Sequence, residues 1–129
     1  MLTVSRVDWP VFAAAYGHAR RTSDIVREMT TELAELPHET TVSYHLTDDG
    51  LSGFGVTDTG ELIALFSLAR GRGDVLVSAA TDAGATRLDC FDGYLPSLYA
   101  RHGFVPVRRE ENWTPGGPDV VYMSREWSA

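Results

Sequence analysis

The sequence predicts an α+β fold in one domain over residues 1–129, with a mixed, mostly antiparallel sheet flanked by helices. The order of the elements carries this prediction, because helical patterns fill the first quarter of the chain and turn-bounded strand patterns follow. Size and composition agree with it. A chain of 129 residues, 43% hydrophobic and 22% charged, has the length and mix of one globular domain, and it should bury roughly two thirds of its unfolded surface.

Two helices are expected in the N-terminal quarter. Asp8 stands before Pro10 as a capping carboxylate, and the first helix should run from there to about Arg20. A second cap is available at residues 22–24. The apolar residues after it recur at helical spacing: Ile25, Met29, Leu33 and Leu36. Pro37 should end this second helix, because the residue before a proline avoids the helical backbone conformation.

Strand patterns and turns occupy the rest of the chain. Strands are expected at residues 41–46, 51–57, 61–68, 87–91, 105–109 and 120–124. Two short helices interrupt them, at residues 75–83 and 95–101, and a glycine stops each one. The stretch 61–68 (ELIALFSL) is the most apolar of the strands, and we expect it to lie at the centre of the sheet.

The charge balance and the cysteine count exclude several classes of function. The formal net charge is −7, so the chain should repel nucleic acid and anionic membranes. The single Cys90 excludes an internal disulfide, and the four scattered His give no zinc spacing, so no metal is expected. No apolar run approaches the roughly 18 residues of a membrane span, and no secretory signal is evident. The cytoplasm is therefore the expected location.

Residues 66–77 (FSLARGRGDVLV) are the first place where chemistry is expected. A strand enters a glycine-rich turn that leads into a helix. Backbone N–H groups and the positive end of the helix dipole then point at one spot, which suits a phosphate group, and Arg70 and Arg72 can add charge. The spacing fits neither the dinucleotide fingerprint nor the P-loop. The competing interpretation is a solvated surface turn.

Residues 88–104 (LDCFDGYLPSLYARHGF) are the second candidate. A strand leads to a short helix that carries Tyr99 and ends at a Gly-Phe corner. A tyrosine hydroxyl, with an ordinary pKa of about 10, can protonate a thiolate or donate a hydrogen bond. The alternative for Tyr99 is packing in a half-buried position. Cys90 is expected to be a small core residue, because nothing nearby in the sequence would activate its thiol.

The two stretches together resemble the GCN5-related N-acetyltransferases, from about Asp48 to the end of the chain. In that family a strand leads into an Arg/Gln-x-x-Gly-x-Gly/Ala turn, and residues 70–75 (RGRGDV) fit its Arg-x-x-Gly-x part. A later helix ends in Leu/Phe-Tyr-x-x-x-Gly-Phe, which residues 98–104 (LYARHGF) match in full. Asp92 occupies the position of a frequent Asn and would contact the coenzyme or the turn. The resemblance implies the family's fold, acetyl-CoA as cosubstrate, and transfer of the acetyl group to an amine.

The resemblance also implies roles for particular residues. Tyr99 would be the acid that protonates the leaving thiolate. Glu61, at the start of the apolar strand, would be the base, with His45 as the second candidate. The main chain at Phe66 and Leu68 would pair with the pantetheine arm of the coenzyme. The turn that would hold the pyrophosphate, largely through backbone N–H groups, comprises Arg70, Gly71, Arg72, Gly73, Asp74 and Val75.

Departures from the family pattern support an alternative function. Asp74 puts a carboxylate at the expected phosphate site, Val75 replaces a small residue, and the following helix is short. A catalytically degenerate protein that binds or inhibits another protein is therefore the alternative to an enzyme. The short chain favours a phage or mobile-element origin.

The acceptor and the oligomeric state are less constrained by the sequence. The acidic surface favours a cationic amine, on a small molecule or on a basic protein tail, and disfavours a nucleobase. Residues 107–113 (VRREENW) would form a solvated strand edge or one wall of the acceptor cleft. A homodimer is left open.

Overall fold

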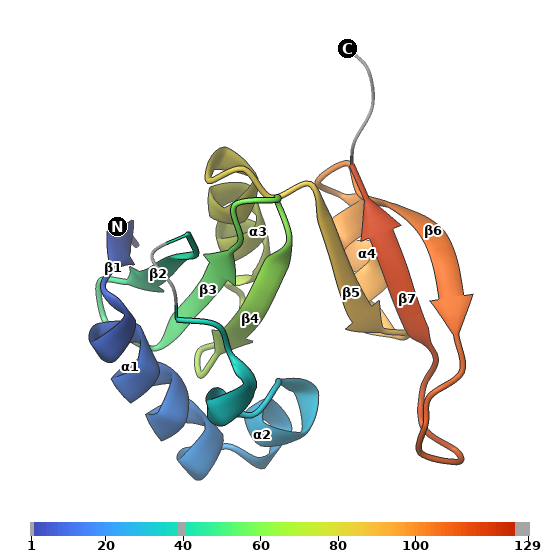
Figure 1. Ribbon diagram of the computed structural model, residues 1–129, viewed down its shortest axis with the longest axis horizontal. Coiled ribbons are helices and arrows are strands. Elements are labelled where there is room, and N and C mark those ends of the chain that lie inside the picture. Colours follow the sequence, from blue (N-terminus) through green and yellow to red (C-terminus); the bar gives the residue numbers. More distant parts are fainter. Residues whose placement is uncertain (1, 39–40, 126–129) are drawn as a thin grey trace.

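The computed structural model describes residues 2–38 and 41–125 of the chain (Figure 1). Its elements are, in order, β1 (Val4–Val7), α1 (Trp9–Thr22), α2 (Asp24–Met29), η1 (Leu33–Glu35), β2 (Ser43–Thr47), β3 (Ser52–Val56), β4 (Leu62–Ser67), α3 (Gly73–Asp82), β5 (Arg87–Phe91), α4 (Tyr94–Ala100), β6 (Val105–Glu110) and β7 (Val120–Ser124). From β2 onward, every helix and strand lies where the sequence predicts it, to within about two residues at each end. Among residues 2–38 and 41–125, no helix is long and apolar enough to cross a membrane.

The strands form two antiparallel sheets that meet at a single point. The first sheet has the order β1-β2-β3-β4, and the second has the order β5-β7-β6. β4 and β5 touch through one parallel bridge, between Glu61 and Arg87. The prediction of a mixed, mostly antiparallel sheet flanked by helices is therefore confirmed. The expectation that the apolar strand β4 lies at the centre of the sheet is wrong, because β4 is the edge strand of the first sheet and meets β5 only at that bridge.

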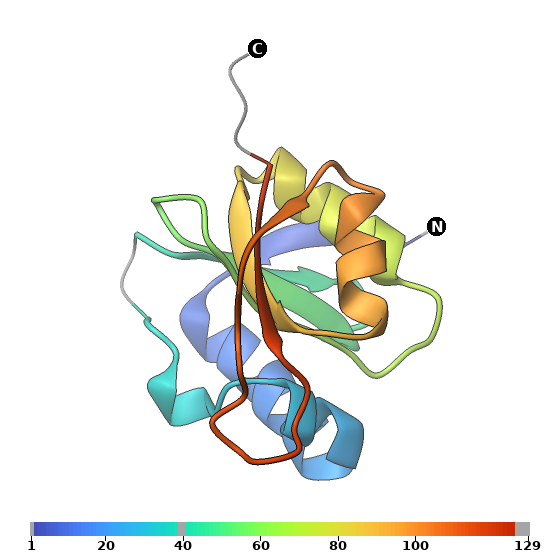
Figure 2. The same cartoon turned by 90° about the vertical axis from the view of Figure 1, so that its right-hand side faces the viewer.

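Helices cover both faces of the strands (Figures 1 and 2). α1 packs across one face of the first sheet, α3 lies on the opposite face, and α4 packs on the second sheet. On the α1 face the core consists largely of aromatic rings, with centroids 4.4 to 5.9 Å apart: Phe12, Tyr16, Tyr44 and Phe66. On the α3 face the core is largely aliphatic and includes Leu76, Val77, Leu88, Leu98 and Met123. Burying each such side chain stabilises the fold by about 1.5–3 kcal/mol.

The N-terminal quarter differs from the prediction in three respects. A strand, β1, precedes the first helix and pairs antiparallel with β2. Asp8 occupies the N-cap position of α1, but its side chain makes no capping hydrogen bond. The second helix ends at Met29 instead of Leu36, and its buried contact is Val26, whereas Ile25 is 74% exposed. The apolar spacing that predicted a longer helix was therefore wrong.

The early end of α2 has a local cause. Ser23 caps the helix as predicted, because its hydroxyl accepts a hydrogen bond from the Val26 N–H (3.2 Å). Thr30, a β-branched residue with extended backbone, donates its hydroxyl to the Val26 carbonyl (2.5 Å). Tyr16 of α1 then donates its hydroxyl to the Thr31 carbonyl (2.5 Å). These two bonds satisfy carbonyls that a longer helix would have used, and they fix the chain in a turn away from α2.

Candidate active site

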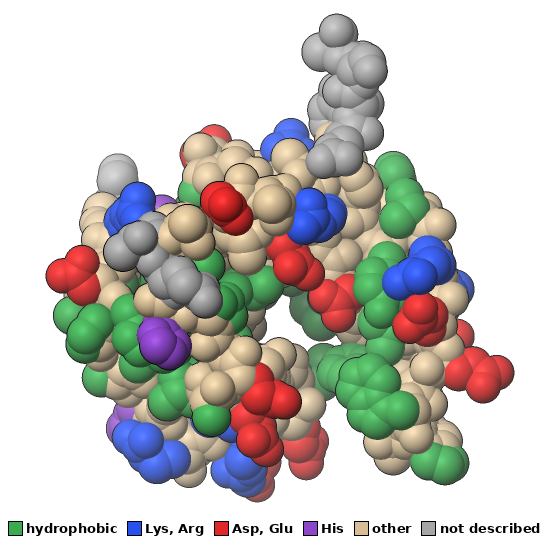
Figure 3. Space-filling model, in the orientation of Figure 1, with side chains coloured by type: hydrophobic (Ala, Val, Ile, Leu, Met, Phe, Trp, Pro, Cys, Tyr) green, Lys and Arg blue, Asp and Glu red, His purple; other side chains and the backbone are tan. Residues whose placement is uncertain are grey.

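The space between β4 and β5 is the strongest candidate for a functional site. Beyond the bridge at Glu61 and Arg87 the two strands diverge toward their C-terminal ends, and Figure 3 shows the molecule hollowed between its two halves. Among the described strands, none pairs with the outer edge of β4 from Leu62 to Ser67. Backbone N–H and C=O groups along that edge are available to an extended ligand. The side chains of residues 63–65 are only partly buried although they are apolar.

β4 carries a bulge in the middle of this free edge. Gly53 of β3 pairs with Phe66 while Gly55 pairs with Ile63, so β4 has one residue more than β3 over this interval. Within the described chain, Ala64 is the one non-glycine residue with a positive φ (55°). Such a conformation costs on the order of 1–3 kcal/mol and clusters at functional sites. The extra residue leaves backbone groups without a partner on β3, where a ligand carbonyl could accept a hydrogen bond from them.

The glycine-rich turn follows the C-terminal end of β4 and therefore lies at the open end of this space. Gly71 has φ +77°, and α3 begins two residues later at Gly73. A Cβ on Gly73 would lie 3.0 Å from the Leu98 side chain, so the glycine lets α3 approach α4 closely. The first N–H groups of α3, at residues 73–75, have no acceptor within the helix. Together with the helix dipole they can bind an anion.

The two arginines of the turn behave differently. The Arg72 guanidinium donates to both carboxylate oxygens of Asp49 (3.0 and 2.5 Å) and to the Ser52 hydroxyl (3.2 Å). The hydrogen bonds from Arg72, and after them the one from the Thr47 hydroxyl, hold the pKa of Asp49 well below its usual range. The Arg72 side chain thus anchors the turn to the β2–β3 connection. Arg70 is exposed and has no hydrogen bond or ion pair with the described residues.

The Asp74 carboxylate reaches from α3 to the end of α4. It accepts hydrogen bonds from His102 Nε2 (2.8 Å) and from Nε and Nη2 of Arg101 (3.3 Å each). The hydrogen bond from His102 contributes most, and those from Arg101 next, to a lowered pKa of Asp74. The negative charge that the sequence places in the glycine-rich turn is thus partly offset by the Arg101 guanidinium, just after α4. The next residue, Val75, is 43% exposed.

Tyr99 lies on α4 and is 4% exposed. Its ring makes an edge contact with Phe104 (centroids 5.9 Å apart), and its hydroxyl has no hydrogen bond with the described residues. Burial, and then the nearby Cys90 and Asp89, raise the pKa of Tyr99 above its ordinary value. Cys90 is buried as expected, and burial raises the pKa of its thiol to about 12, so it is not an activated nucleophile. Tyr99 is a proton donor that stays protonated over the physiological range.

The remaining predicted site residues are spread along the space. Glu61 lies at the closed end, where its backbone N–H already donates to the Thr57 hydroxyl (3.0 Å) and is therefore not available to a ligand. Asp92 follows β5 at the open end and is paired with Arg109 (2.9 Å). The length of β4, six residues, or about 20 Å, separates Glu61 from the glycine-rich turn. The structure therefore does not bring these residues into one cluster, and a long ligand would be needed to span them.

Phe66 lies near the C-terminal end of β4 and Leu68 just beyond it, whereas the second base candidate lies elsewhere. The Phe66 side chain is buried against α1, and the N–H of Leu68 donates to the Leu51 carbonyl (2.8 Å). His45 is on β2, stacked on Phe54 (centroids 4.8 Å apart), and burial lowers its pKa. Two strands away from β4 in the sheet order, it does not line the space. Among the described residues, no group of His, Cys, Asp and Glu could hold a metal ion.

Solved structures share this arrangement, although no family model and no curated protein matches the sequence. An acyl-CoA N-acyltransferase from Pseudomonas aeruginosa superposes with a TM-score of 0.70 at 17% identity, over 98% of this chain and 99% of that one. The chain has the fold of the GCN5-related N-acetyltransferases (GNAT fold). Arabidopsis thaliana NAA60 in complex with a bisubstrate analogue (TM-score 0.61, 13% identity) matches over 96% of both chains. A chimera of the Vibrio cholerae spermidine N-acetyltransferase SpeG and hSSAT (0.63, 15%) covers 95% of this chain and 93% of that one.

The bulge in β4 is a feature of the candidate site that the sequence analysis did not predict. The bulge at Ala64 has no signature in the stretch ELIALFSL, since alanine carries no preference for a positive φ. A signal was present on the opposite strand. Gly53 and Gly55 both lack room for a Cβ, which would overlap the His45 carbonyl at the first and lie 2.7 Å from the Tyr44 ring at the second. Two such glycines in a buried strand mark the place where β4 departs from regular pairing.

Proposed function

We propose that this chain is an acyl-CoA N-acyltransferase that transfers an acetyl group from acetyl-CoA to an amine. The observation that carries the proposal is the divergence of β4 from β5, with a bulge at Ala64 on the free edge and the N-terminus of α3 at the open end. Such a space offers an extended ligand backbone partners along its length and an anion site at one end. Acetyl-CoA is a ligand of that kind. Because the reaction needs an acyl-coenzyme A, the cytoplasm is the location that we propose.

The residues of the open end fit the phosphates of a coenzyme. Gly71 has open space around it, and the N–H groups of residues 73–75 are unused by the helix. Arg70 adds a positive charge that is not paired with any described residue, while Arg72 fixes the turn through its ion pair with Asp49. The main chain around Phe66 to Leu68 would pair with the pantetheine arm through groups other than the Leu68 N–H, which donates to the Leu51 carbonyl. Asp92, across the opening at the end of β5, would contact the coenzyme or the turn.

The chemistry then needs a base, polarisation of a carbonyl, and an acid. The coenzyme supplies an activated thioester carbonyl when it is bound. Free N–H groups at the bulge can donate to the carbonyl oxygen as negative charge develops on it. Glu61 would accept the proton of the attacking amine, directly or through water. Tyr99, kept protonated by its buried position, would return a proton to the sulfur as the C–S bond breaks.

The acceptor class is a small-molecule or protein amine. The similar structures include a spermidine N-acetyltransferase chimera, whose named acceptor is a small-molecule amine, and NAA60 in complex with a bisubstrate analogue. Their fold supports the reaction type for this chain.

The proposal is tested by coenzyme binding and by thiol release. Acetyl-CoA at 100 times its Kd should stabilise the protein by about 2.7 kcal/mol, which raises the melting temperature by several degrees. ATP is the control, because it brings phosphates without a pantetheine arm. Release of free thiol on addition of amines then measures transfer. Equal melting temperatures with and without millimolar acetyl-CoA would contradict the proposal.

One observation favours the alternative of a catalytically degenerate binding protein. All six residues of β6 are exposed, and apolar side chains there and in the next loop lie open to solvent: Val105 (57%), Val107 (63%) and Trp113 (81%). An exposed apolar edge strand is a common binding surface for another protein. This alternative predicts that acetyl-CoA neither stabilises the chain nor is consumed by it with any amine.

A further inference from the structure

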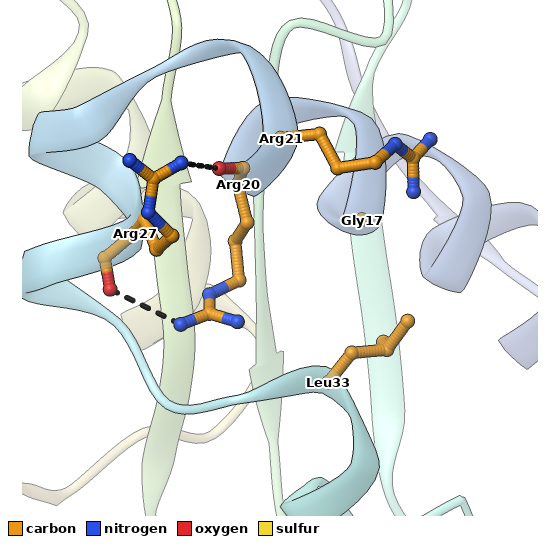
Figure 4. Close-up of a pocket in the computed structure, with 5 residues that line it drawn as sticks. All are labelled: Gly17, Arg20, Arg21, Arg27 and Leu33. Carbon is orange, nitrogen blue, oxygen red and sulfur yellow. Dashed lines mark hydrogen bonds between the residues drawn. The ribbon is translucent and has the colours of Figure 1, made fainter.

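A second hollow lies between α1, α2 and η1. Its volume is about 540 Å³, within the range of small-molecule sites. We call it the arginine pocket, and it is lined by Gly17, Arg20, Arg21, Arg27 and Leu33 (Figure 4). Three of the eleven arginines of a chain with net charge −7 therefore line one hollow, with Arg20 and Arg27 facing each other.

The arginines of the pocket are held in position before any ligand arrives. Arg20 Nη2 donates to the Arg27 carbonyl (3.1 Å), and Arg27 Nη1 donates back to the Arg20 carbonyl (3.0 Å), as Figure 4 shows. Arg20 Nε also donates to the Thr30 hydroxyl (3.2 Å). These bonds fix both guanidinium groups and still leave donors on each, so little conformational freedom is lost when a ligand binds.

The positive charge of the pocket is only partly compensated. Arg27 forms an ion pair with Asp24, and among the described residues no other carboxylate is paired with any of the three arginines. In Figure 4 the Arg21 side chain extends away from Arg20 and Arg27. Arg21 has no hydrogen bond or ion pair with the described residues. Gly17 keeps the space open, since a Cβ there would lie 3.2 Å from Arg21 Nη1 and 3.5 Å from Leu33. Fixed guanidinium groups with free donors are suited to bidentate recognition of carboxylates and phosphates.

The pocket adjoins the strand that borders the proposed active site. Tyr16, the residue before Gly17, makes an edge contact with Phe66 of β4 (centroids 5.4 Å apart). Leu33 packs in the same apolar cluster as Ile63 and Ala64, the residues of the bulge. α2 lies at the level of the open end of the space between β4 and β5 in both Figure 1 and Figure 2.

We infer that the arginine pocket binds an anionic group, a carboxylate or a phosphate, of a small-molecule ligand. Under the proposed function, on which this second step rests, that ligand is the acceptor, which then carries an anionic group as well as its amine. This result reverses the sign expected from the net charge. The overall charge of −7 favours a cationic acceptor, whereas the local charge beside β4 favours an acidic one.

Anion binding can be measured without any acyl transfer. NMR spectra of the arginine Nε–H groups are recorded while inorganic phosphate, and separately acetate, is added at constant ionic strength. We expect saturable shifts at Arg20, Arg21 and Arg27, and a loss of affinity of roughly fivefold or more in Arg21→Gln. Arg6→Gln is the matched control, because Arg6 is exposed on β1 at the other edge of the first sheet. Equal, non-saturating shifts of all arginines would overturn the inference.

A second variant and a second assay separate the two steps. Gly17→Ala keeps all three charges but narrows the pocket, so it should also weaken phosphate binding. Thiol release is then compared for glycine against glycinamide and for phosphoethanolamine against ethanolamine, which distinguishes carboxylate from phosphate. We expect the anionic member of one pair to have a kcat/KM at least about tenfold higher, with the advantage lost through KM in Arg21→Gln. Equal values within both pairs would overturn the acceptor assignment. Phosphate binding without transfer to any amine would leave the pocket standing and refute the proposed function.

Discussion

Removing the Tyr99 hydroxyl should slow the reaction and leave the stability of the protein almost unchanged. The Tyr99 residue is 4% exposed and its hydroxyl has no hydrogen bond with the described residues, but that hydroxyl is not among their fully buried, unpaired polar atoms, so it keeps some contact with solvent. Tyr99→Phe should therefore change the free energy of unfolding by less than about 1 kcal/mol. If Tyr99 protonates the leaving thiolate, the same change should slow thiol release about tenfold or more.

The raised pKa of Tyr99 gives this prediction a second readout. Because the folded protein retains this proton where the unfolded chain releases it, the stabilisation is complete below pH 10 and is lost as pH rises above that value. The loss amounts to at most about 1.4 kcal/mol for each pH unit. Tyr99→Phe should lose less stability than the wild type in urea unfolding at pH 9 to 11.

Two controls decide the outcome of these measurements. Tyr122→Phe removes a hydroxyl from β7 that donates to Glu110, and it should leave thiol release unchanged. Wild-type rates in Tyr99→Phe would remove Tyr99 from the reaction. Equal pH dependence of unfolding in wild type and variant would refute the raised pKa of the Tyr99 hydroxyl.

Three further changes probe the surroundings of the site. Asp49→Asn should weaken coenzyme binding several-fold, measured by calorimetry, because it loosens the Arg72 anchor of the turn; Asp48→Asn is the control and should bind as the wild type does. Asp74→Asn should tighten coenzyme binding at low salt, because it frees Arg101 and His102, and weaker binding would mean that the carboxylate organises the site. Without ligand, the variant should lose less stability than the wild type as pH falls below about 4, because the lowered pKa of Asp74 stabilises the wild type above that pH. Gly53→Ala should lower the free energy of unfolding by about 1–3 kcal/mol in urea, because its Cβ would overlap a backbone carbonyl, and a neutral result would show that β3 can move away from β2.

The sequence by itself determined most of the secondary structure and the fold class. Strands β2 to β7 have alternating or apolar patterns bounded by glycine turns, and such local signals survive because the tertiary fold agrees with them. The motif at residues 98–104 and the turn at residues 70–75 were sufficient to indicate the GNAT fold, since each marks a local geometry that glycine or a helix end requires. In the N-terminal quarter, local spacing failed where the core selected Val26 instead of Ile25.

The tertiary structure alone decided which charges are free and where the chain opens. Arg72 and Asp49 are 23 residues apart, and Asp74 and His102 are 28 apart, so no local pattern could show that these charges are paired. The bulge at Ala64 arises from how β4 packs on β3. The arginine pocket exists because α2 ends at Met29 and the chain turns back over α1. Ion pairing and cavities depend on distances between segments remote in the chain, and those distances are set only when the core closes.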